Sequence, residues 1–352
     1  MHTRRPTAQI EHRQPTPAVR FAPRQLVLVF CFPLLAAGLA QQTQPLTLQA
    51  ALAKAAEQAP VQSAQAELAD AQANLQRTLA DPLLTRPARL QAEQRLALAQ
   101  ASLNRAKAQA ESGIVQAYTQ VLEALQQVAL AKKSTELAQR NLEVAQIRQK
   151  NGSGTALESK NAQARLEDAQ RNQAFAEQGL ANARSNLRSL VGEFAELAPL
   201  PPAPALPERS LLQSLLEQTP DLVQAQQRLE LAKLQLELLD PSYAAQAEIE
   251  AAKARAEQAE AALREIRRGL SLQYENLYTQ AQNAFRALGI QQSLLQNARE
   301  QLAADKRRLD SGLISPLAYA QSELAALQAE LAALQAQGSY LRALYGLYAG
   351  GR

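Results

Sequence analysis

The chain has 352 residues, of which 47% are apolar and only 4% aromatic, and its formal net charge is +4. That charge comes from residues 1–40, which hold five arginines and one glutamate, so the remaining residues carry 32 basic and 32 acidic side chains. A neutral body offers no basic face for nucleic acid, and we expect no nucleic-acid partner. The abundance of Ala, Leu, Gln and Glu is typical of long helices and coiled coils.

Residues 1–40 have the pattern of a secretory signal peptide. Arg20 and Arg24 precede an apolar run from Leu26 to Leu39, and small residues stand at the −1 and −3 positions of a cleavage site after Ala40. The run is about 14 residues long, which is short of the roughly 20 that a membrane-spanning helix needs. We therefore expect export with cleavage rather than a membrane anchor.

The residue inventory limits the chemistry of the mature chain. Cleavage would remove Cys31, His2 and His12, which are the only cysteine and histidines. Without them the chain cannot form disulfides, Cys/His zinc sites, or the nucleophilic pairs of Cys or Ser with His. No glycine-rich phosphate-binding motif is present either. The sequence thus predicts no catalytic residue, no metal site and no cofactor, and a protein that is not an enzyme.

Residues 41–196 form the first of two predicted repeats. Thr47 is expected to cap a short helix and Pro60 to open a second one at its N-terminal turn. The proline-flanked segment Asp81–Pro87 then breaks the helix. From Ala88 to Gln149 the apolar residues recur in sevens, which predicts a rod about 90 Å long with a stripe that packs on another helix.

The segment Lys150–Thr155 interrupts this pattern and predicts a reversal of the chain. We expect Asn151, Gly152 and Gly154 to supply the positive-φ backbone that such a turn needs. A return helix is predicted from Ala156 to about Leu190, so that rod and return helix form an antiparallel hairpin.

Residues 197–209 contain five prolines and predict an extended, polyproline-type linker. Residues 210–352 then repeat the first half at an offset near 160. The pairs that match are Pro60 and Pro220, Asp81 and Asp240, Tyr118 and Tyr278, and Gly152 and Gly312. The predicted fold is all-α: two tandem repeats of long antiparallel coiled-coil hairpins with little or no β-structure.

This order of elements resembles the TolC-type outer-membrane efflux family. The likeness rests on the repeat starts, Leu46–Leu52 and Glu217–Leu222, and on the two hairpin turns with the residues that follow them. It implies a homotrimer whose helices form a hollow tunnel, with the turns docking onto a periplasmic adaptor protein of an inner-membrane pump. The docking residues it implies are Asn151, Gly152, Ser153, Gly154, Leu157 and Glu158 in the first turn, and Ser311, Gly312, Leu313, Ile314, Ser315, Pro316 and Leu317 in the second.

Two features depart from the family pattern. Family members carry a pair of membrane strands between the short and long helices, and each such strand takes about 9–11 residues. The connections Asp81–Pro87 and Asp240–Tyr243 have no room for them. In addition, Ala318 stands where the family has an acidic residue after the second turn, whereas Glu158 keeps it after the first.

We expect an exported protein, either associated with the outer membrane or periplasmic.

An alternative from another class is a structural protein, namely a periplasmic coiled-coil spacer or tether that uses the same hairpins without a lumen. An adaptor protein also has a helical hairpin, but it needs flanking β-domains that the sequence lacks. The tunnel and the spacer differ in whether the helices close into a ring. Leu313 and Ile314 favour the tunnel, because a spacer would be expected to place polar residues at a reversal.

Overall fold

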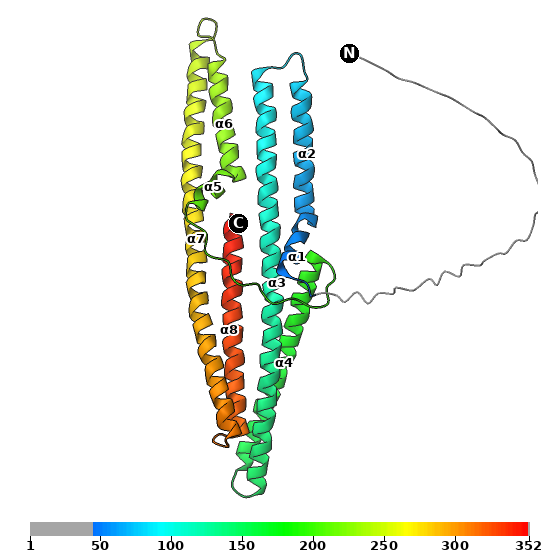
Figure 1. Cartoon of the computed structure of the whole chain (residues 1–352). Coiled ribbons are helices and arrows are strands. Elements are labelled where there is room, and N and C mark those ends of the chain that lie inside the picture. The colour runs from blue at the N-terminus through cyan, green and yellow to red at the C-terminus, as the bar shows by residue number, and fades with distance from the viewer. Residues whose placement is uncertain (1–44, 351–352) are drawn as a thin grey trace, which may run out of the picture. The chain divides into compact units, whose positions relative to one another are not determined.

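The computed structural model describes residues 45–350, so the predicted signal peptide lies outside the described residues. Their secondary structure is helical, apart from one isolated parallel bridge between Leu46 and Leu197, which confirms the all-α prediction. The elements in chain order are α1 (Leu48–Ala53), the 3-10 helix η1 (Lys54–Glu57), α2 (Ala59–Leu79), α3 (Arg86–Lys150), α4 (Ala156–Val191), α5 (Leu211–Glu217), α6 (Pro220–Glu237), α7 (Gln246–Asp310) and α8 (Pro316–Tyr348) (Figure 1).

The two longest helices correspond to each other in the two repeats. α3 and α7 have 65 residues each, or about 100 Å at 1.5 Å per residue. The Thr85 hydroxyl caps α3 by accepting from the backbone N–H of Ala88 at 3.3 Å. The heptad stripe predicted on this helix is real, since Ile114 and Val121 are both fully buried. The predicted rod is therefore confirmed to within two residues at either end.

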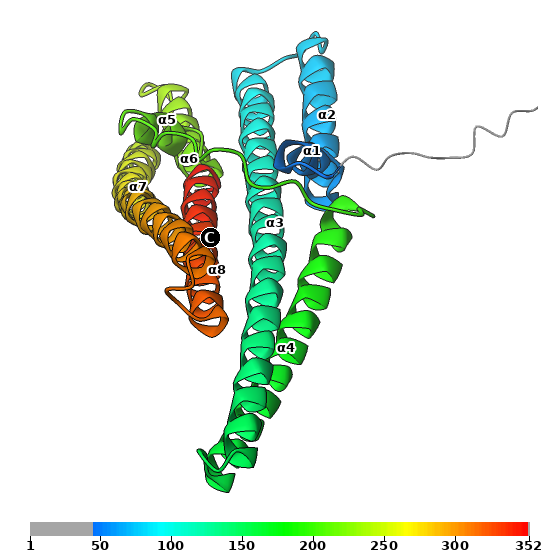
Figure 2. The ribbon, with the colours of Figure 1, turned by 60° about the horizontal axis from the view of Figure 1, so that its bottom comes forward.

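The helices pack as a single layer in which each touches its neighbours (Figures 1 and 2). Towards the hairpin turns the order is α4, α3, α8, α7, and towards the opposite end it is α2, α3, α6, α7. α3 therefore packs against all four of its neighbours in the layer, and also against the short helices α1 and η1, and lies in the interior of the layer. The edges of the layer are α4 and α2 on one side and α7 on the other.

The proline-rich connection between the repeats binds to the helices through a regular series of its carbonyl groups. Side chains of α3, α8 and α7 donate to carbonyls that recur every third residue, which is the period of a polyproline II helix. The bonds are Tyr118 to Ala198 (2.6 Å), Gln337 to Pro201 (2.7 Å), Tyr340 to Pro204 (2.9 Å) and Tyr278 to Pro207 (3.1 Å). The apolar side chains that pack inward follow the same period: Leu197, Leu200, Ala203 and Leu206. This segment, which we call the strap, thus fastens both repeats together.

Candidate functional site

The first hairpin turn is a Schellman motif, in which two backbone bonds close the end of α3. The N–H of Ser153 donates to the carbonyl of Arg148 at 2.9 Å, and that of Gly152 donates to Gln149 at 3.1 Å. Gly152 has φ +72°, a left-handed conformation that favours glycine. The turn is therefore rigidly defined by its own backbone.

The second turn has the same construction. The N–H of Leu313 donates to the carbonyl of Arg308 at 2.8 Å, and that of Gly312 donates to Leu309 at 2.9 Å. Gly312 has φ +71°. The internal repeat thus extends to the hydrogen bonds of the two turns.

The prediction that Asn151 and Gly154 also adopt positive φ is wrong. Asn151 has φ −84°, and Gly154 is not among the positive-φ glycines of the described residues. One left-handed residue suffices, because the Schellman bonds complete the reversal. Gly154 instead lies close to the end of α3, where an added Cβ would stand 2.9 Å from the Cβ of Arg148. The second repeat has Ile314 in its place.

The residues that begin the return helices act as caps. The Thr155 hydroxyl accepts from the N–H of Glu158 at 3.1 Å, and the Glu158 carboxylate accepts from the N–H of Thr155 at 3.0 Å, which is a capping box. Ser315 accepts from the N–H of Ala318 at 3.1 Å, with Pro316 in the first helical turn. Ala318 has no carboxylate to return the bond. Glu158 therefore has a structural role that its counterpart lacks.

Apolar side chains are exposed at both turns. Leu313 is 76% exposed and Leu157 is 66% exposed, whereas Ile314 and Leu317 are half-buried. The residue in the Leu313 position of a Schellman motif commonly packs on the helix it follows, but here Leu313 stays in solvent. The exposed leucines are thus available for contact with another molecule.

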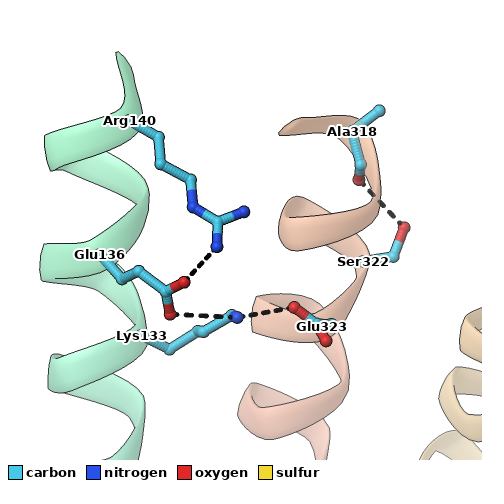
Figure 3. Close-up of polar contacts among 6 residues, drawn as sticks. All are labelled: Lys133, Glu136, Arg140, Ala318, Ser322 and Glu323. Carbon is cyan, nitrogen blue, oxygen red and sulfur yellow. Dashed lines mark hydrogen bonds and ion pairs between the residues drawn. The ribbon is translucent and has the colours of Figure 1, made fainter. Parts of the chain in front are cut away.

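The two turns are connected through α3 and α8 rather than directly. The Lys133 ammonium contacts the carboxylate of Glu323 at 2.6 Å and that of Glu136 at 3.2 Å, and Arg140 binds Glu136 (Figure 3). These contacts lie at unequal distances from the two turns. Lys133 precedes Asn151 of the first turn by 18 residues along α3, whereas Glu323 follows Ser315 of the second turn by only 8 residues along α8. At 1.5 Å per residue, the first turn extends about 15 Å beyond the second.

Further polar contacts join α3 to α8 at heptad spacing. Gln126 donates to Glu330 at 3.2 Å. Farther from the turns, the Arg342 guanidinium contacts the Glu123 carboxylate at 2.7 Å and the Thr119 hydroxyl at 2.8 Å. Thr119, Gln126 and Lys133 are seven residues apart along α3, so they face α8 in one row. We call this row and its partners the α3–α8 ladder.

Sequence reasoning missed the ladder. The sequence did contain a signal for it, namely polar residues seven positions apart along the predicted rod, because such a row can face a neighbouring helix. Two charged residues at the Lys133 end of the ladder have shifted pKa values. The Glu323 and Glu136 carboxylates raise the pKa of Lys133, and the Lys133 ammonium, followed by Arg140, lowers the pKa of Glu136.

A second polar contact joins α7 to α8 near their turn. Asp305 is 7% exposed, and its carboxylate accepts from Ser322 at 2.7 Å, from Gln301 at 3.0 Å and from Arg308 at 3.1 Å. These bonds, with that of Ser322 first, lower the pKa of Asp305. The Asp305 carboxylate thus joins the two helices of the second hairpin close to its turn.

Within residues 45–350, no three side chains of His, Cys, Asp or Glu come together as a metal site would require. No helix in this part of the chain has the length and apolarity to cross a membrane.

Comparison with known proteins places this architecture in a family. The family model described as outer membrane efflux protein matches residues 84–193 and 233–350. No curated protein matches the chain.

Solved structures share the fold at low sequence identity. The CmeC outer membrane channel of Campylobacter jejuni is 13% identical, with a TM-score of 0.60 and 86% of each chain covered. The outer membrane protein VceC of Vibrio cholerae is 16% identical, with a TM-score of 0.57, 86% of this chain and 96% of that chain covered. A membrane protein of Pseudomonas aeruginosa is also 16% identical, with a TM-score of 0.60 and coverage of 86% and 93%.

At these identities the solved structures establish the fold alone. The family model reaches further, because its two matched segments lie in corresponding parts of the two repeats and together span more than half of the residues. The chain belongs to the outer membrane efflux protein family.

Proposed function

We propose that the chain is the subunit of an exported, TolC-like tunnel, a homotrimer whose hairpin turns dock onto a periplasmic adaptor of an inner-membrane pump. The observation that carries this proposal is the single layer of helices. A globular bundle covers each helix with neighbours on several sides, whereas here α4 and α7 are edges of a layer and do not pack on each other.

The edges of the layer expose large apolar side chains. Phe175 on α4 is 62% exposed, and on α7 Ile290 is 61% and Leu294 is 49% exposed. Apolar residues along an unpaired helix edge mark an association surface. Because the two edges differ, the α4 edge of one copy would meet the α7 edge of the next, and such head-to-tail contacts close into rings.

The size of the ring and its location rest on family likeness and on the leader. Members of the family are expected to close with three copies, and residues 1–40 support export. The exposed Leu157 and Leu313 support docking at the turns, where the two hairpins end.

Substitutions at the edges test the assembly. Phe175→Glu and Ile290→Glu each place a charge where the proposed contact is apolar, and the change recurs at every interface of the ring. We expect light scattering at micromolar concentration to give a trimer mass for the unaltered chain and a monomer mass for the edge variants, with helical content retained.

Leu313→Glu is the matched control, because it puts the same charge on an exposed apolar position away from both edges, and its mass should stay trimeric. A monomeric unaltered chain, or edge variants that keep the trimer mass, would contradict the proposal. A long solid rod would instead favour the structural spacer.

A further inference from the structure

The ends of the two hairpins are basic, although the body of the chain is neutral. Residues 145–160 contain three cationic side chains and one carboxylate, and residues 305–318 contain three cationic side chains and two carboxylates. Residues 41–352 as a whole hold 32 of each sign. Positive charge is therefore concentrated where the turns are.

Helix dipoles explain only part of this charge. Cations in the last turn of a helix are favourable, which accounts for Arg148, Lys150 and Arg307 at the ends of α3 and α7. Lys160 lies in α4 beyond its first turn, where the dipole does not account for a cation. The first turn of α8 has no acidic residue at all. Helix dipoles therefore do not account for all of the positive charge at the turns.

The carboxylates within these two segments are already engaged. Asp305 pairs with Arg308 at 3.1 Å, Asp310 pairs with Lys306 at 2.9 Å, and Glu158 accepts from its own helix cap. In the described part of the chain, four exposed cationic side chains at or next to the turns make no ion pair: Arg148, Lys150, Lys160 and Arg307.

An uncovered strip of α3 lies among these charges. The row of α3 that faces α8 continues at heptad spacing from Lys133 to Arg140 and then to Ile147. Arg140 lies beside Ala318, in the first turn of α8 (Figure 3). One heptad further on, about 10 Å along the axis, Ile147 has passed the start of α8 and is 57% exposed.

The unequal reach of the two turns therefore forms a step. Its wall is the end of α3 with Ile147, and its ledge is the second turn with Leu313. Cationic side chains flank both parts, with Arg148 on the wall and Arg307 at the ledge.

We infer that this step receives the end of a partner protein that presents carboxylates around an apolar side chain. The inference rests on the proposed docking function and adds the chemistry of the partner. Unpaired cations around an apolar contact attract an acidic surface and disfavour a basic one, because like charges brought together cost free energy.

Two synthetic probes test the charge preference. Each is a short helical hairpin with two leucines at its turn, flanked by four glutamates in one probe and by four lysines in the other. We expect the full chain to bind the acidic hairpin at least tenfold more tightly than the basic one. Raising NaCl from 50 to 500 mM should weaken this binding severalfold, since exposed charges are screened.

The test variant combines Arg148→Glu, Lys150→Glu and Arg307→Glu, and should lose at least tenfold in affinity for the acidic hairpin. Its matched control, with Arg95→Glu, Lys107→Glu and Lys233→Glu, makes the same change of net charge at exposed positions of α3 and α6 far from the turns and should bind unchanged.

Three outcomes would overturn the inference. They are no preference for the acidic hairpin, an equal loss in the control variant, and binding to phosphatidylglycerol vesicles without binding to the acidic hairpin, which would point to a lipid surface. Light scattering on the same samples separates this failure from that of the proposed function. A trimer without acidic preference leaves the tunnel standing, whereas a monomer removes the tunnel itself.

Discussion

At the scale of single residues, Tyr118 shows how one buried hydroxyl can join three segments. Its side chain is fully buried on α3, and its Oη lies 2.8 Å from the carbonyl of Leu46 and 2.6 Å from that of Ala198. These carbonyls belong to the segment before α1 and to the strap. Burial raises the pKa of Tyr118 to about 12.

Tyr118→Phe should lower the free energy of unfolding by about 1 kcal/mol at pH 7, because it removes the donor to a buried carbonyl. The folded chain holds the phenolic proton more tightly than the unfolded chain does. The contribution of Tyr118 is therefore complete below pH about 10 and is lost as the pH rises towards 12.

Urea unfolding of both proteins at several alkaline pH values measures this difference. The stability of the unaltered chain should fall more steeply than that of the variant between pH 10 and 12. Parallel curves over this range would show that the proton of Tyr118 is not held by the fold.

The bonds of the strap were only partly accessible from sequence. The match of Tyr118 with Tyr278 at an offset of 160 is plain in the sequence, and both donate to the strap. Their acceptors are backbone carbonyls, which every residue carries, so no side-chain pattern marks them. A proline-rich segment is also typical of a free linker, and only the packing reveals that this one is bound.

Among the elements, α3 and α8 approach each other closely at Gly338. A Cβ at this position would stand 2.6 Å from the Oε1 of Glu123 and 3.3 Å from the Cβ of Thr119. The same Oε1 accepts from Arg342 at 2.7 Å. A side chain at Gly338 would therefore displace the carboxylate from its cation.

Gly338→Ala should destabilise the chain, although alanine favours helices over glycine by up to about 1 kcal/mol. Gly289→Ala in the middle of α7 is the control, because nothing lies within 4 Å of its added Cβ. It should raise the free energy of unfolding by roughly 0.5–1 kcal/mol.

Denaturant unfolding of the two variants should thus give opposite signs. If Gly338→Ala stabilised the chain as much as Gly289→Ala does, the close approach of α3 and α8 at this point would be incorrect.

The hairpins could be predicted because glycine and proline are local signals. Gly152 and Gly312 mark the turns, and Pro60 and Pro220 mark helix starts. The step could not be predicted, because it depends on which heptads of α3 and α8 align. Lys133 could have met Glu330 as readily as Glu323 from spacing alone. The register is fixed by the sum of contacts between helices about 190 residues apart in the chain.

For the whole molecule, residues 1–40 decide whether the protein is exported, and the assembly decides between the tunnel and the spacer. If residues 1–40 are a signal peptide cleaved after Ala40, the exported protein begins at Gln41 and contains no thiol. Intact-mass analysis of the exported protein, with a thiol-reactive label, measures both. A mass that includes residues 1–40, or labelling of Cys31, would show that cleavage does not occur there.

The proposed tunnel requires that the single layer of helices closes with further copies into a tube. Electron microscopy of the purified particle in negative stain should then give end-on views that are rings with threefold symmetry and a stain-filled centre. Solid rods without a lumen, or single hairpins at the same protein concentration, would contradict it.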